Sequence, residues 1–209
     1  MTREIKALPI GISIFSNNRE RNYLYIDKTH ILQNLIMQGE CYFLARPRRF
    51  GKSLTISTLE AMFAGKSDLF RDLKAEPWVQ KQSQNPAPVI TLDLSGIRIY
   101  HSADERNTSL SKELLDIAHE YDINLEEEKY ASDYLIQLLA KLSKINQVVL
   151  LIDEYDAPII NNLHEKIKQN RIEKSYVIFI VLLNQKENIY VLYLLLGYLN
   201  LQKQVYFLL

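Results

Sequence analysis

The tripeptide Gly51-Lys52-Ser53 is the part of the sequence whose residue types point most directly to chemistry. It stands between an apolar run and a helical pattern, which is the context of a phosphate-binding loop. A helix start offers free backbone N–H groups and partial positive charge, and a glycine lets the backbone approach a phosphate. The lysine can reach β- and γ-phosphates, and the serine hydroxyl can ligate magnesium. The predicted loop comprises Arg46, Pro47, Arg48, Arg49, Phe50, Gly51, Lys52 and Ser53.

The loop departs from the usual pattern at its first position. The pattern G-x-x-x-x-G-K-[ST] has a glycine where this chain has Arg46, so the loop is expected to wrap phosphates differently. A Gly-Lys-Ser or Gly-Lys-Thr tripeptide also arises by chance in roughly one chain in ten of this length. Taken alone, the tripeptide is better explained as the start of an ordinary surface helix.

Two carboxylates about a hundred residues later favour a phosphate-binding loop over an ordinary surface helix. Asp153 and Glu154 directly follow the apolar run 148–152, which has the character of a buried strand. In open parallel sheets, ligands bind at the carboxyl ends of the strands. There Asp153 can hold the hydration shell of Mg²⁺, and Glu154 can polarise a water for attack on a γ-phosphate. An isolated Asp-Glu would be a solvated strand end, but together with the Lys52 loop it favours a nucleotide site.

The elements that must position these residues follow from the hydrophobic pattern. Apolar runs at 41–45, 89–94 and 148–152 predict buried strands, and helical stripes are predicted at 53–63, 110–121 and 134–142. A short strand-like run at 23–26 precedes a further helical pattern that ends at Gly39, and the stretch from Glu76 to Pro88 has the composition of a connection. Strands alternating with helices predict an α/β fold with a mainly parallel sheet flanked by helices.

Several charged residues allow more than one interpretation. Arg46, Arg48 and Arg49 can neutralise phosphate charge within the chain, act across a subunit interface, or form a solvated loop. Asp27 stands before a helical pattern and is best explained as its N-cap. Asp93 ends a strand near the same sheet edge, where a supporting role at the site and a turn-forming role are equally compatible.

Composition and charge limit the remaining classes. The chain has 209 residues, 47% of them hydrophobic and 24% charged, as expected for a folded domain. Its 25 basic and 25 acidic residues give a net charge of zero, so nothing attracts nucleic acid over long range. The single cysteine, Cys41, cannot form an internal disulfide and predicts a reducing compartment, by default the cytoplasm. The four histidines lack the spacing of zinc ligands.

Neither export nor membrane insertion is predicted. The N-terminus mixes both charge signs and lacks the apolar run of a signal peptide. The apolar stretches 176–183 and 189–199 are each shorter than the roughly 20 residues that span a bilayer. They are therefore interpreted as buried strands or helices, with contact to a membrane or to a partner as the alternative.

Four segments together resemble a known family, the bacterial AAA-ATPase-like proteins. The resemblance covers residues from about 8 to 165 and rests on segments 8–12 (LPIGI), 23–29 (YLYIDKT), 42–53 (YFLARPRRFGKS) and 148–158 (VVLLIDEYDAP). In this family the ATPase domain often precedes a nuclease-like region of the PD-(D/E)XK type. The arginine-rich loop is similar to the family's own version of the phosphate loop.

The resemblance implies a P-loop NTPase-like three-layer fold that binds ATP with Mg²⁺. It places Lys52 and Ser53 on phosphate and metal, and Asp153 and Glu154 as the Walker B pair, with Lys52 and Glu154 as the residues that assist hydrolysis. It also permits a homo-oligomer and an unidentified protein partner. A nucleic-acid partner rests on family analogy only.

The resemblance weakens after about Arg171. The family usually continues with a helix and a strand ending in a Thr-Gly-containing segment, whereas this chain becomes rich in Ile, Leu, Val and Tyr and stops at Leu209. We therefore expect an AAA-ATPase-like P-loop domain at 1–170 and a divergent apolar tail at 171–209, with a frameshift or truncation as the hypothesis for its origin. The alternative is that the apolar stretches are further core strands.

The expected function is Mg-dependent ATP hydrolysis coupled to an unknown partner or process. The alternative is a scaffold that holds nucleotide without hydrolysis, or a degenerate remnant of an ATPase–nuclease-like protein. A third class, suggested by the usual architecture of the family that the chain resembles, is a nuclease-associated defence or mobile-element component, but the sequence shows no catalytic carboxylate–lysine cluster of that kind.

Overall fold

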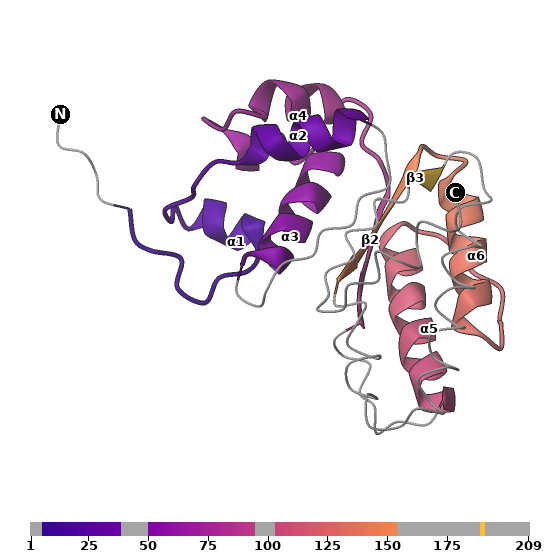
Figure 1. Cartoon of the computed structure of the whole chain (residues 1–209). Helices are drawn as coiled ribbons and strands as arrows, with labels where there is room; N and C mark the ends of the chain where they lie inside the picture. Colours follow the sequence, from indigo (N-terminus) through magenta and orange to yellow (C-terminus); the bar gives the residue numbers. More distant parts are fainter. Residues whose placement is uncertain (1–5, 39–49, 95–102, 154–188, 191–209) are drawn as a thin grey trace, which may run out of the picture.

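The computed structural model describes residues 6–38, 50–94, 103–153 and 189–190. Helices α1 to α4 lie on one side of the strands and α5 and α6 on the other (Figure 1). The described elements are α1 (Phe15–Glu20), α2 (Thr29–Gln38), α3 (Lys52–Phe63), the 3-10 helix η1 (Ser67–Phe70), α4 (Glu76–Gln82), β1 (Val89–Asp93), α5 (Ala103–Glu120), α6 (Ala131–Leu142), β2 (Val148–Asp153) and β3 (Ile189–Tyr190).

The described strands form a parallel sheet in the order β1-β2-β3. Strands β1 and β2 stay in register from Val89 opposite Val149 to Asp93 opposite Asp153. Strand β3 pairs with the first part of β2, with Ile189 opposite Val148. The predicted α/β class and parallel sheet are thus confirmed for the described part of the chain.

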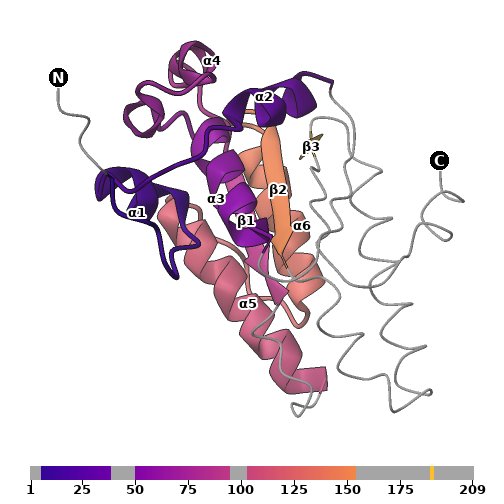
Figure 2. The same cartoon turned by 60° about the vertical axis from the view of Figure 1, so that its left-hand side comes forward.

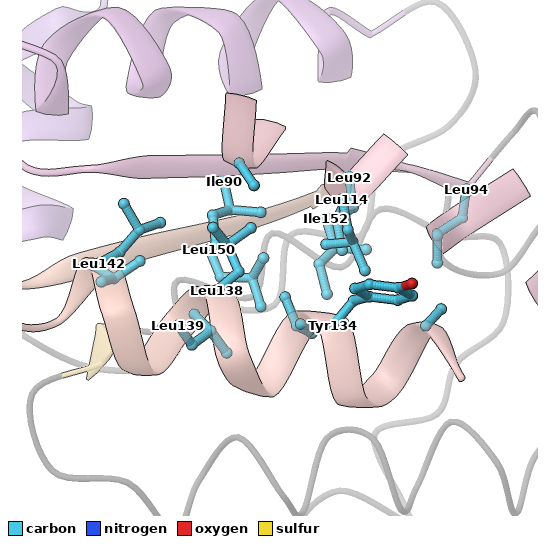
Figure 3. Packing of buried hydrophobic residues seen from close by; sticks show 14 residues of the cluster. Ile90, Leu92, Leu94, Leu114, Tyr134, Leu138, Leu139, Leu142, Leu150 and Ile152 are labelled. Carbon is cyan, nitrogen blue, oxygen red and sulfur yellow. The ribbon is translucent and has the colours of Figure 1, made fainter. Parts of the chain in front are cut away.

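Alternate residues of β2 pack against helices on opposite faces, so this strand is buried on both sides. Val148, Leu150 and Ile152 belong to a cluster with residues of α5 and α6. Figure 3 shows how side chains of α6, among them Leu138 and Leu142, point toward the strands. The apolar stripe predicted at 134–142 is this buried face, since Tyr134, Leu135, Leu138, Leu139 and Leu142 are all buried.

The other face of the sheet is covered by α3 (Figure 2). Ile56, Leu59 and Phe63 of α3 pack with Val149 and Leu151 of β2. At its end the helix reaches the amino side of β1, where the Ala87 N–H donates to the Phe63 carbonyl at 3.1 Å. Helix α3 therefore runs antiparallel to the strands, and its N-terminus lies at their carboxyl ends.

A second apolar cluster fixes the outer side of α3. Phe15 of α1 and Phe70 of η1 are fully buried, with ring centroids 4.8 Å apart, and they pack with Met62 of α3. The Phe15 N–H also donates to the Ser57 hydroxyl of α3 at 3.0 Å. Helix α3 is thus held between the sheet and the N-terminal helices.

Asp27 fixes the start of α2, as its predicted capping role requires. One carboxylate oxygen accepts from the Thr29 N–H at 2.9 Å and from its hydroxyl at 2.7 Å, and the other accepts from the Lys74 N–H at 2.8 Å. Partial burial acts to raise the pKa of the Asp27 carboxyl, but the hydrogen bonds from Thr29 and Lys74 outweigh it and lower the pKa below its usual value. The same carboxylate therefore caps α2 and ties it to the turn before α4.

Two local predictions are wrong. Residues 23–26 form no strand, since the Leu24 N–H finds a single backbone partner, the Ala7 carbonyl at 2.8 Å, and no ladder follows. The polar stretch after Glu76 contains α4, because Pro77 occupies the first turn of a helix, where its missing N–H is tolerated, and Val79 is buried. The predicted strand at 41–45 and the predicted tail elements, except the two residues of β3, lie outside the described residues.

Within the described ranges, no helix is both long and apolar enough to cross a lipid bilayer.

The outer edge of β1 is closed at its start by Tyr121, just after α5. The Val89 N–H donates to the Tyr121 hydroxyl at 2.8 Å, and that hydroxyl donates to the Val89 carbonyl at 3.1 Å. Burial raises the pKa of the Tyr121 phenol, which keeps its proton available for this bond. One hydroxyl thereby satisfies both backbone groups that β1 would otherwise leave unpaired at this point.

We predict that Tyr121→Phe destabilises the fold by about 1–3 kcal/mol, because both backbone groups of Val89 lose their partner. The measurement is urea unfolding at neutral pH. The matched control is Tyr130→Phe, since that side chain is 52% exposed, and surface changes usually stay within about 0.5 kcal/mol. Equal stability of the two variants would contradict the assigned role of Tyr121.

Candidate nucleotide site

The site is built where the N-terminus of α3 meets the carboxyl end of β2. The Ser53 hydroxyl donates to the Asp153 carboxylate (Oγ to Oδ2) at 3.0 Å, across a hundred residues of sequence. This bond joins the two stretches that sequence analysis singled out. Of the predicted site residues, the structure describes Phe50, Gly51, Lys52, Ser53 and Asp153, whereas Arg46, Pro47, Arg48, Arg49 and Glu154 lie outside the described residues.

Gly51 is the N-cap of α3 and has a left-handed backbone, with φ 73° and ψ 29°. Its carbonyl accepts from the Thr55 N–H at 3.0 Å and from the Thr55 hydroxyl at 2.9 Å. A Cβ atom at this position would meet nothing within 4 Å. The backbone conformation, and not lack of space, therefore requires the glycine here.

The residues of the candidate site differ strongly in exposure. Lys52 and Asp153 are 6% and 7% exposed, so both charged groups lie below the protein surface. Phe50, directly before the glycine, is 63% exposed. A buried cation and a buried carboxylate beside a helix N-terminus can bind a phosphate together with its counter-ion.

Asp93 brings a further carboxylate to this edge of the sheet. It ends β1 directly opposite Asp153, and its N–H donates to the Glu113 carboxylate of α5 at 3.5 Å. Burial raises the pKa of the Glu113 carboxyl, the nearby charges of Asp93 and Asp116 raise it further, and the bond from Asp93 opposes them. Glu113 was not singled out from the sequence, because it is one of several acidic residues of this helix and has no distinguishing spacing.

The residues present fit Mg²⁺. Mg²⁺ prefers oxygen ligands, and the Ser53 hydroxyl and the Asp153 carboxylate bring two such oxygens together at the end of β2. Among the described residues no group of three or more His, Cys, Asp and Glu side chains could hold a metal by itself. Mg²⁺ commonly binds one or two carboxylates and completes its shell with phosphates and water.

Comparison with known proteins finds a family model and a curated relative that are similar to this chain. A family model described as "Predicted AAA-ATPase" matches residues 9–207. A curated relative, described as "Uncharacterized protein in vnfD 5'region" of Azotobacter chroococcum mcd 1, is 38% identical over 167 residues. The match covers 76% of this chain and 30% of that protein, so the chain corresponds to less than a third of its relative. No solved structure matches the chain significantly.

We predict that Gly51→Ala costs about 1–2 kcal/mol of stability, because an alanine is strained in the left-handed conformation, and that it also weakens binding of a nucleoside triphosphate. Gly11→Ala is the matched control, since Gly11 has φ 75° and equally open surroundings. Chemical unfolding and calorimetric titration of ATP measure the two effects. Both variants should lose similar stability, and only Gly51→Ala should lose affinity. Equal affinities of the two variants would show that the backbone at Gly51 does not approach the phosphates.

Proposed function

Because the chain belongs to the AAA-ATPase-like family of predicted ATPases, we propose that it binds ATP with Mg²⁺ at the N-terminus of α3 and hydrolyses the γ-phosphate. The observation that carries this proposal is the hydrogen bond between Ser53 and Asp153, which joins a helix N-terminus to the carboxyl end of a buried strand. We further propose that the family's P-loop three-layer architecture underlies the observed arrangement of helices on both faces of a parallel sheet.

Each described site residue has a role in this proposal. Gly51 allows the backbone N–H groups of the loop to face the phosphates, and the Lys52 ammonium neutralises the β- and γ-phosphates. Ser53 and Asp153 hold Mg²⁺, which when bound neutralises charge on the phosphate oxygens. The remaining loop residues, Arg46, Pro47, Arg48, Arg49 and Phe50, complete the predicted phosphate-binding loop.

The hydrolytic step needs a general base, and we propose Glu154 for this role. Glu154, which follows Asp153 directly in the sequence, orients a water opposite the bond to ADP and accepts its proton as the oxygen attacks the γ-phosphorus. The bond from that phosphorus to the bridging oxygen breaks, ADP leaves, and Lys52 compensates the charge that develops on the bridging oxygen. The products are ADP and inorganic phosphate.

Only the family supports a proposal about the partner, the oligomeric state and the process that hydrolysis serves. The chain matches only 30% of its curated relative, so we propose a protein partner or a homo-oligomer without naming a process. The division into an ATPase-like domain at 1–170 and a tail at 171–209 is likewise a proposal, although the family match runs on to residue 207. The single cysteine, Cys41, supports a cytoplasmic location.

Calorimetric titration of Mg·ATP, combined with phosphate-release assays, tests the function. We predict that Lys52→Ala weakens binding by roughly thirtyfold or more, corresponding to about 2 kcal/mol or more for removing one partner of a buried charge contact. Lys81→Ala is the control, because this lysine lies on the exposed side of α4. It should bind ATP like the unaltered protein.

The same samples separate an ATPase from a scaffold. Glu154→Gln should keep ATP bound and slow phosphate release by about 10²–10⁴-fold, the usual contribution of a general base. Binding without turnover in the unaltered protein would support the nucleotide-holding scaffold. No binding at all would exclude both functions.

A further inference from the structure

Asp93 is the second carboxylate at the carboxyl edge of the sheet, and the strand register fixes its position. It is the in-register partner of Asp153 on the neighbouring parallel strand, and neighbouring strands lie about 4.8 Å apart. Its N–H donates to Glu113 of α5. The backbone of Asp93 is therefore held both by the sheet and by a helix.

Both carboxylates lie on the face of the sheet that α3 covers. Val89 of β1 packs in the same cluster as Val149 and Leu151 of β2, together with residues of α3. Side chains alternate between the faces along a strand, so Asp93 lies on the same face as Val89, just as Asp153 lies on the same face as Leu151. The bond between Ser53 and Asp153 confirms this face for Asp153.

The two carboxylates differ in exposure, and this difference suggests different tasks. Asp153 is 7% exposed and accepts the hydrogen bond from Ser53, so it is buried beside the N-terminus of α3. Asp93 is exposed and lies one strand further out. Because β1 and β2 are neighbouring strands and the two aspartates are in register, we expect the Asp93 carboxylate to come within reach of water bound to a metal beside Asp153.

We propose that Asp93 is a positioning residue of the metal site, whose carboxylate accepts hydrogen bonds from water ligands of Mg²⁺ and thereby sets the metal dependence of nucleotide binding. This inference rests on the proposed function. Mg²⁺ usually keeps several water ligands in nucleotide sites, and those waters need acceptors. Without metal, the same negative charge repels the triphosphate. Asp93 therefore favours the metal complex of the nucleotide over the free nucleotide.

The test compares affinity for a fluorescent ATP analogue with Mg²⁺ and with a chelator, because the ratio of the two affinities measures metal linkage. Asp93→Asn keeps the shape of the side chain and removes its charge. We expect this ratio to fall about tenfold, as is typical when a partner of a metal ligand is lost. The affinity without metal should stay equal or increase. Titration with Mn²⁺, followed by electron paramagnetic resonance, should show that the nucleotide complex of Asp93→Asn binds the ion more weakly than that of the unaltered protein.

Asp116→Asn is the matched control. Asp116 is also an exposed aspartate whose charge acts on Glu113, but it lies on α5, away from the register pair. Its metal linkage should equal that of the unaltered protein. Thermal unfolding of both variants checks that the fold is retained.

Two results would overturn the proposal for Asp93. If Asp93→Asn has the same metal linkage as Asp116→Asn, the carboxylate does not act on the metal. If Asp93→Asn loses affinity equally with and without Mg²⁺, its role is structural or directed to the nucleotide. Failure of the proposed function would look different, since the unaltered protein would then bind the analogue in neither condition, and both proposals would fall.

Discussion

The structure depends on one constraint, the fixed position of the α3 N-terminus at the carboxyl end of β2. The 3.0 Å bond from Ser53 to Asp153 defines this junction, and the packing of Ile56, Leu59 and Phe63 on the sheet keeps the helix in line with it. This packing brings together the two stretches of the candidate site, which lie a hundred residues apart in sequence. The junction also combines positive helix-end potential with a buried carboxylate, which suits an anion bound together with a cation.

The surrounding elements hold this junction from two sides. On one face, α5 and α6 bury the strands, and Tyr121 satisfies the start of the β1 edge. On the other, α1 and η1 pack behind α3, while Ser57 of α3 accepts the N–H of Phe15. Helix α1 and η1 therefore support the helix at whose N-terminus the candidate site lies.

The sequence predicted the strands at 89–94 and 148–152, because buried strands are nearly continuous apolar runs. It also singled out a candidate site, because a phosphate loop ties residue types to a strand-loop-helix context. Ser53 and Asp153 meet as expected, and Asp27 caps α2 as expected. The strand expected at 23–26 failed because its apolar residues do not all face a core: Ile26 is 74% exposed. Helix α4 was missed because Pro77 and polar neighbours resemble a loop. The contacts of Tyr121 and Glu113 with distant backbone groups leave no periodic pattern in a sequence.

The most direct test of the central claim is a crystal structure of the full chain with Mg²⁺ and a non-hydrolysable ATP analogue. The predicted result is a triphosphate at the N-terminus of α3, with Lys52 on its β- and γ-phosphates and Ser53 and Asp153 at the metal. A nucleotide bound elsewhere, or a metal held without Ser53 and Asp153, would contradict the claim that this junction is the nucleotide site.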